Sequence, residues 1–258
     1  MIQDYLRLEI FLITILVFGL WEQFFPKRKI LINRFIRWPG NIFLIVIFII
    51  FKKIILPMGL IGIGQTLSRN NFGLFNIISL NIYIEMIISI LLFDFFIWAQ
   101  HLLMHKVDFL WRLHRVHHSD PVLDTSSSIR FHPLEFILSY VFKIIFIILF
   151  GFSVEAILIF EVLLSSFSIM THANILINKR FEKILGMLFI TPSMHIVHHL
   201  KADQSKNFGF CLSLWDRAFK SFSDGCDINK EIGLEYFDNH SKQGIWDLLK
   251  QPFVNYKQ

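Results

Sequence analysis

Residues 101–118 read HLLMHKVDFLWRLHRVHH and follow directly on a long apolar run. The stretch holds five of the eleven histidines of the chain, namely His101, His105, His114, His117 and His118. In a helix the first two share a face because they are four residues apart, and the last three repeat that spacing. Unrelated surface positions would explain any one of these histidines but explain five of them poorly. Because neutral imidazole is a common ligand for zinc, copper and iron, the stretch predicts a metal site.

The same pattern returns at residues 195–199, which read HIVHH. The two stretches together supply eight clustered histidines, more than one tetrahedral or octahedral ion can bind. Two metal ions are therefore expected. A set of histidines alone can bind either iron or zinc, and the spacing does not choose between them.

The composition is that of an integral membrane protein. Of the 258 residues, 54% are hydrophobic and thirty are Phe, and the mean hydropathy is +0.55. The formal net charge of +5 does not indicate nucleic-acid binding, because the basic residues flank apolar runs, as juxtamembrane anchors do. Cys211 and Cys226 are the only cysteines, which excludes a disulfide framework and a zinc ribbon.

Five apolar runs are long enough to form helices in a membrane, at residues 6–24, 41–63, 74–100, 134–150 and 154–171. The first lacks a basic leader and a cleavage site, so we expect a retained helix and not a signal peptide. The second carries Lys52 and Lys53 near its middle, so it either spans the membrane or forms a re-entrant hairpin. We expect an all-α membrane protein of four or five transmembrane helices, with a cytoplasmic helical cap that holds the histidines.

Only residues 151–153 separate the last two runs, which predicts an antiparallel helical hairpin. A hairpin returns the chain to the side it left, so His172 and both histidine stretches should lie on one membrane face. The basic residues expected at helix ends on that face are Lys27, Arg28, Lys29, Arg34, Arg37, Lys106, Arg112, Arg115, Lys179, Arg180 and Lys183, against little more than Arg69 opposite. The positive-inside rule makes the histidine side cytoplasmic.

Three motifs together resemble the histidine boxes of the fatty acid hydroxylase and sterol desaturase superfamily: HLLMH at 101–105, HRVHH at 114–118 and HIVHH at 195–199. The resemblance covers about residues 90–222. It extends to Asp94, Trp98, RFHPLE at 130–135, THAN at 171–174, TPSMH at 191–195, NFG at 207–209 and WDRAF at 215–219.

The resemblance implies a membrane-embedded site of two iron ions that uses O2 to attack an unactivated C–H bond of a lipid. The ligands it implies are His101, His105, His114, His117, His118, His195, His198 and His199, with His172 as a ninth. The reaction would be hydroxylation or, as an alternative, desaturation. It would take two electrons from a separate electron-transfer protein, and zinc could substitute for iron in the site.

A zinc-dependent membrane hydrolase and a metal-binding transporter are alternatives from other functional classes. A transporter should place polar groups near the midplane of its spans. Here the polar groups gather at one end of the apolar runs, which favours the enzyme.

Two further residues are candidates for contact with the site. Asp94 lies seven residues before His101, on the same helical face, and we expect it to accept a hydrogen bond from a ligand imidazole. His132 is a possible additional site residue, although Pro133 and Glu135 also suit the first turn of a helix. His240 stands alone in a polar tail and is expected to be solvated.

The chain divides into three expected parts. Residues 1–73 form N-terminal membrane helices and a basic connection, residues 74–222 form the catalytic domain, and residues 223–258 form a tail. Within the tail, residues 243–250 should form a short interfacial helix with Trp246 at the headgroup level.

Overall fold

The computed structural model describes residues 2–30, 34–55, 57–78, 80–225, 230–237 and 243–255. His240 and Cys226 lie outside these ranges. The helices are α1 (Ile2–Phe24), α2 (Arg34–Ile55), α3 (Gly59–Arg69), α4 (Leu74–Ile77), α5 (Ile82–Lys106), α6 (Asp108–His118), α7 (Pro133–Phe150), α8 (Val154–His172), α9 (Lys179–Leu185), α10 (Pro192–His198), α11 (Leu214–Ala218) and α12 (Ile245–Lys250). Short 3-10 helices η1 (Thr125–Ile129), η2 (Glu235–Phe237) and η4 (Gln251–Phe253) complete the set. Within the described ranges, extended pairing is limited to isolated bridges.

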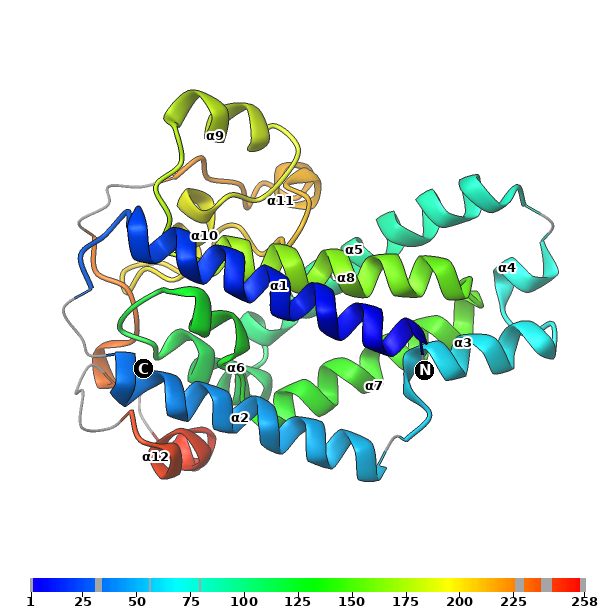
Figure 1. Cartoon of the computed structure of the whole chain (residues 1–258), viewed down its shortest axis with the longest axis horizontal. Helices are drawn as coiled ribbons and strands as arrows, with labels where there is room; N and C mark the ends of the chain where they lie inside the picture. The colour runs from blue at the N-terminus through cyan, green and yellow to red at the C-terminus, as the bar shows by residue number, and fades with distance from the viewer. Residues whose placement is uncertain are drawn as a thin grey trace.

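Four helical segments are long and apolar enough to cross a membrane, namely Arg34–Ile77, Ile82–Lys106, Pro133–Phe150 and Val154–His172. Many of their apolar side chains are exposed, among them Ile54, Ile77 and Ile87, as expected for residues that face lipid. The predicted all-helical membrane fold is therefore confirmed. A fifth long helix, α1, lies against α8 (Figure 1).

The second apolar run is not one helix. α2 ends at Ile55, and α3 begins at Gly59, whose φ of +70° favours glycine. The 22 residues of α2 measure about 33 Å, which matches a bilayer core of about 30 Å. The expectation that Lys52 and Lys53 interrupt the middle of a span is wrong, because both lie in the last turn of α2.

The predicted hairpin is formed by α7 and α8. Gly151 ends α7 in the left-handed conformation, with φ +63°, and the Ser153 hydroxyl caps α8 by accepting from the Ala156 amide. The hairpin packs on α5, where the Phe93 ring lies between those of Phe152 and Phe160 at centroid distances of 4.3 and 4.8 Å. This packing aligns α5, α7 and α8 along the bundle.

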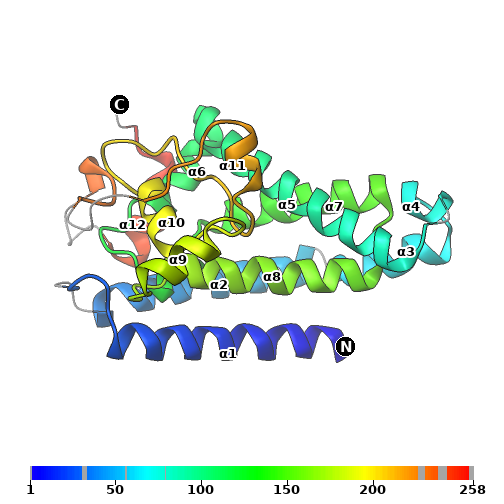
Figure 2. The same cartoon turned by 90° about the horizontal axis from the view of Figure 1, so that it is seen from above.

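The segments that carry the histidines gather at one end of the bundle. Figures 1 and 2 show α6 and α10 at the end where α5 and α8 finish, opposite α3 and α4. The short helix α12 also lies at this end, and its Leu248 is buried against Leu44 of α2 and Val116 of α6. The predicted helix around Trp246 is confirmed as α12, and the Trp246 side chain is exposed.

A buried ion-pair network ties α2 to the chain after α6. The Arg37 guanidinium donates to both Asp120 carboxylate oxygens at 2.9 and 2.6 Å and to Asp124 at 2.8 Å, with all three side chains fully buried. Burial alone would raise the pKa of Asp120, but the positive charges of Arg37 and Arg130 outweigh it and lower that pKa. The network fixes the loop that follows the second histidine motif.

Replacement of Arg37 should therefore destabilise the fold. In Arg37→Ala, Asp120 and Asp124 keep buried charges without their partner, so the free energy of unfolding should fall by about 3 to 5 kcal/mol. Lys201→Ala breaks the exposed pair with Glu231 and should cost no more than about 1 kcal/mol. Chemical denaturation of the full chain in detergent measures both. Equal losses would contradict a structural role for the network.

Candidate metal centre

The structure brings nine histidines together in two neighbouring groups. The first group is His101, His105, His114, His118 and His198, and the second is His117, His172, His195 and His199. Within each group the candidate ligand atoms all lie within 4.8 Å of one another. All nine histidines expected as ligands, including His172, belong to one of the groups.

Helical spacing explains how the groups divide. In α6, His114 and His118 are four residues apart and join the first group, whereas His117 points to the second. In α10 and its C-cap the assignment is reversed, because His195 and His199 join the second group and His198 the first. Both segments therefore contribute to both groups and hold them side by side.

α10 begins where its sequence predicts. The Thr191 side chain caps the helix by accepting from the Met194 amide, and Pro192 follows at the first helical position. His195 and His198 then lie on the helix, and His199 is its C-cap residue. The TPSMH motif therefore sets the register of the last three histidines.

Four of the nine rings have a fixed tautomer. In these rings Nδ1 faces an oxygen that can only accept: Phe208 O for His101 (2.7 Å), Lys206 O for His198 (2.8 Å), a Glu135 carboxylate oxygen for His114 (2.6 Å) and Ser168 O for His172 (2.6 Å). The proton of the neutral ring is then on Nδ1. Nε2 carries a bare lone pair in each of these rings.

These lone pairs face one another. Nε2 of His101 lies 3.0 Å from Nε2 of His114 and 3.0 Å from Nε2 of His198, although none of the three carries a proton. In the second group, His172 Nε2 lies 3.0 Å from the Nε2 atoms of His117 and His195. Facing lone pairs repel each other unless a cation accepts them. Neighbouring nitrogen ligands about 2.0 to 2.1 Å from a shared ion stand at separations of this size.

The chemistry of the donor set fits a transition metal. Both groups contain only histidine nitrogens, which suit iron and zinc. In six of the histidines that lie outside the spans, burial first and the charges of neighbouring imidazoles second hold the pKa well below its usual value: His114, His117, His118, His195, His198 and His199. These rings are therefore neutral near pH 7, which is the state that binds metal.

Glu135 is a site residue that sequence reasoning missed. It was assigned only to the first turn of α7, but one of its oxygens accepts from His114 Nδ1 at 2.6 Å. Its side chain is 5% exposed, and its second oxygen has no hydrogen-bond partner among the described residues. The sequence signal for this role is a carboxylate at the start of an apolar run, where an ionisable side chain usually has a function.

The expected contact between Asp94 and a ligand imidazole is wrong. Asp94 accepts from the Trp215 indole at 3.0 Å, and it therefore joins α5 to α11. Trp98 of α5 makes the reciprocal contact with Asp216 of α11 at 3.1 Å. Spacing places Asp94 on a face of α5 but does not show which element packs against that face.

Asp216 orients His101 indirectly, through the backbone of Phe208. Its carboxylate accepts from the backbone amides of Phe208 and Gly209 at 3.0 and 2.8 Å. Phe208 in turn offers its carbonyl to His101 Nδ1. A Cβ at Gly209 would lie 2.6 Å from the Leu212 carbonyl oxygen, so this loop requires glycine. The NFG and WDRAF motifs thus position a histidine.

His132 lies outside both histidine groups. Its Nδ1 caps α7 by accepting from the Leu134 amide at 3.3 Å, and its Nε2 faces the Leu249 carbonyl oxygen at 3.3 Å. Its possible role at the site is not supported. The helix-starting role of the motif is confirmed, with Pro133 at the first helical position.

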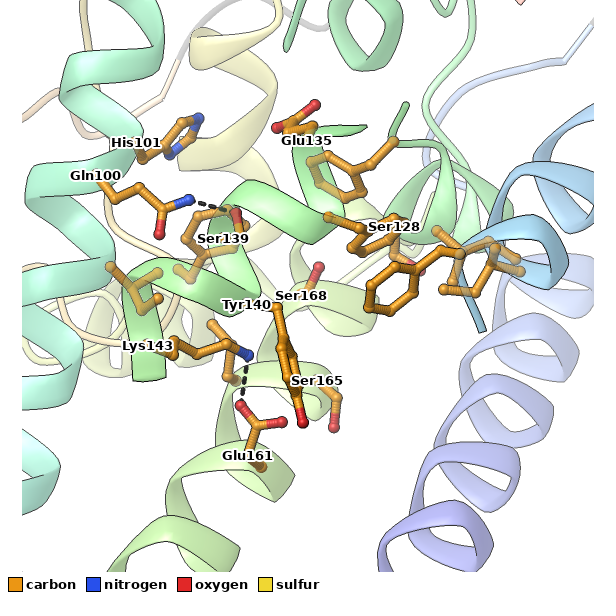
Figure 3. A pocket seen from close by; sticks show the side chains of 18 of the residues that line it. Gln100, His101, Ser128, Glu135, Ser139, Tyr140, Lys143, Glu161, Ser165 and Ser168 are labelled. Carbon is orange, nitrogen blue, oxygen red and sulfur yellow. Dashed lines mark hydrogen bonds and ion pairs between the residues drawn. The ribbon is translucent and has the colours of Figure 1, made fainter. Parts of the chain in front are cut away.

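A cavity of about 240 Å³ leads away from the first group into the bundle (Figure 3). His101, His114 and Glu135 line one end. Apolar side chains cover most of the wall, among them Ile97, Met104, Phe131, Phe136, Ile169 and Phe210. The cavity can therefore hold an apolar chain beside the histidines.

Comparison with known proteins gives a consistent result. Residues 86–221 match the family model described as "Fatty acid hydroxylase". Ornithine lipid hydroxylase OlsE of Rhizobium tropici is 26% identical over 172 residues, which cover 66% of this chain and 50% of that protein. Alkylglycerol monooxygenase of Danio rerio is 33% identical over 132 residues, 49% of this chain and 28% of that protein.

The Caenorhabditis elegans alkylglycerol monooxygenase is 26% identical over 165 residues, which cover 60% of this chain and 32% of the relative. The chain thus spans half or less of the length of the curated relatives it matches. No solved structure matches.

The contact between Glu135 and His114 should strengthen metal binding. In Glu135→Gln the acceptor of the His114 proton loses its charge, so the affinity for Fe²⁺ should fall about 10- to 100-fold. Asp94→Asn is the matched control, since it neutralises another buried carboxylate that contacts no histidine and should retain the affinity. Competition with a metal-sensitive dye on metal-free protein measures both variants. Equal losses would mean that Glu135 acts only through folding.

Proposed function

The chain belongs to the fatty acid hydroxylase family, and from this we infer that it is a membrane-embedded oxygenase that uses two iron ions to hydroxylate an unactivated C–H bond of a lipid. The observation that carries the proposal is the apolar cavity that ends at His101 and His114. Two kinds of relative support a lipid substrate, since their names specify an ornithine lipid and an alkylglycerol.

We assign one metal ion to each histidine group. His101, His105, His114, His118 and His198 would hold the first, and His117, His172, His195 and His199 would hold the second. The bound iron ions would supply the activation of dioxygen and the oxidation of the C–H bond. The oxygens that accept from Nδ1 of four rings keep the Nε2 lone pairs directed at the ions.

The cavity would bind and position the substrate. Its apolar wall excludes water and aligns a chain so that one carbon lies beside His101 and His114. The second oxygen of Glu135, which has no hydrogen-bond partner among the described residues, lies at the same end and can accept a proton there.

The electrons must come from outside the site. Insertion of one oxygen atom of O2 into a C–H bond reduces the other atom to water, which requires two electrons and two protons. We propose that a separate electron-transfer protein delivers the electrons.

We also propose that the histidine site faces the cytoplasm. The segments rich in Lys and Arg flank the end of the bundle that holds α6, α9 and α10 (Figure 1). Lys52, Lys53 and Arg69 lie toward the opposite end of the bundle. The histidine end therefore still carries more basic residues than the opposite end, but by a smaller margin than the sequence alone indicates.

The metal assignment predicts about two iron ions per chain after anaerobic purification from iron-replete cells. His198→Ala should remove activity and lower the metal content while the protein still inserts, since insertion depends on the apolar helices. Elemental analysis measures the metal, and mass spectrometry of cellular lipids measures the product. Lipids that gain one oxygen only with the wild-type protein support a hydroxylase, whereas a loss of two hydrogens indicates a desaturase. Unchanged lipids with a fully loaded protein would contradict both reactions.

The sidedness predicts how introduced cysteines react. In a variant without Cys211 and Cys226, Lys106→Cys should react with a membrane-impermeant thiol reagent only after permeabilisation, whereas Asn70→Cys should react in intact cells. Both positions are exposed, whereas Ser119 is buried and unsuitable. Labelling of Lys106→Cys in intact cells would place the histidines outside.

A further inference from the structure

The far end of the cavity carries an ion cluster inside the apolar bundle. Lys143 of α7 donates to one oxygen of Glu161 of α8 at 2.6 Å, and Arg7 of α1 donates to the other at 2.8 Å. The side chains of Lys143 and Glu161 are 13% and 11% exposed. Figure 3 shows this ion pair at the end of the cavity opposite His101 and Glu135.

A third cation belongs to the cluster. Lys52 of α2 lines the cavity, its Nζ lies 5.0 Å from the centre of the Tyr140 ring, and it acts electrostatically on Glu161. Arg7, Lys52 and Lys143 thus surround a single carboxylate. Arg7 and Lys143, which donate to the two oxygens of Glu161, outnumber this carboxylate by one positive charge.

Such an excess is unfavourable inside a membrane. An ionised side chain is costly at the centre of a bilayer, and charges there usually face a cavity or a partner. Glu161 carries one negative charge and accepts from both Arg7 and Lys143, so it compensates only one of these two cations. An anion in the cavity would compensate further charge.

Building on the proposed function, we propose that this end of the cavity binds the anionic headgroup of a single-chain amphiphile, whose chain then extends to the histidines. Glu135 and Lys143 are eight residues apart on α7, or about 12 Å along the helix. An extended chain advances about 1.2 Å per bond, so the oxidised carbon would lie about ten bonds from the headgroup. Arg7, Lys52 and Lys143 would then determine substrate specificity and position.

The test compares ligands that differ in charge alone. Binding of dodecanoate and of methyl dodecanoate to the metal-free full chain is measured by calorimetry in an uncharged detergent. Wild type should bind dodecanoate at least about tenfold more tightly. Dodecanoyl lysophosphatidylglycerol, compared with monododecanoylglycerol, tests whether the anion is a lipid headgroup or a free carboxylate.

Two variants of one ion pair separate binding from structure. Lys143→Met should abolish the preference for dodecanoate, whereas Glu161→Gln should increase it, although both break the same pair. A purely structural pair would shift both variants in the same direction. Lys52→Met leaves both hydrogen bonds of Glu161 in place and should also reduce the preference, and Lys201→Met, outside the cavity, should not.

Absence of any charge preference in wild type, or equal losses in Lys143→Met and Glu161→Gln, would overturn the inference. Either result would leave the oxygenase proposal standing, because binding is measured without metal or turnover. Conversely, charge-dependent binding by a chain that does not oxidise lipids would support the headgroup site and count against the oxygenase.

Discussion

The repulsion between facing imidazole lone pairs is the constraint on which the site depends. Nε2 of His101 lies 3.0 Å from Nε2 of His114 and 3.0 Å from Nε2 of His198, and each of the three lacks a proton because its Nδ1 is committed to an oxygen. A fold that holds such a set must hold it rigidly. The bundle end, the buried Arg37 network and the packing of α12 provide that rigidity, and they leave the histidines suited to accept cations.

Most of the partners that orient the rings belong to the backbone. Phe208, Lys206 and Ser168 supply carbonyl oxygens, whereas Glu135 supplies a side-chain carboxylate. Every residue has a backbone carbonyl, so the residue types do not show which carbonyls accept hydrogen bonds from the histidines. Sequence reasoning could therefore identify the clustered histidines but not the groups that orient them.

The same distinction explains what could be predicted of the fold. Spacing along a helix is a local property, and it correctly joined His101 with His105 and correctly placed the turn at Gly151. Packing between helices is not local. Asp94 lies on the expected face of α5, but Trp215 meets it there, and the division of the histidines into two groups depends on how α6 and α10 cross the bundle.

The sharing of α6 between the two histidine groups limits how this segment can change in evolution. One helical residue corresponds to a rotation of about 100°. An insertion between His114 and His117 would therefore swing the later ring away from its group, and no substitution elsewhere could restore it. The length of this segment is therefore physically more constrained than the identity of the residues between its histidines.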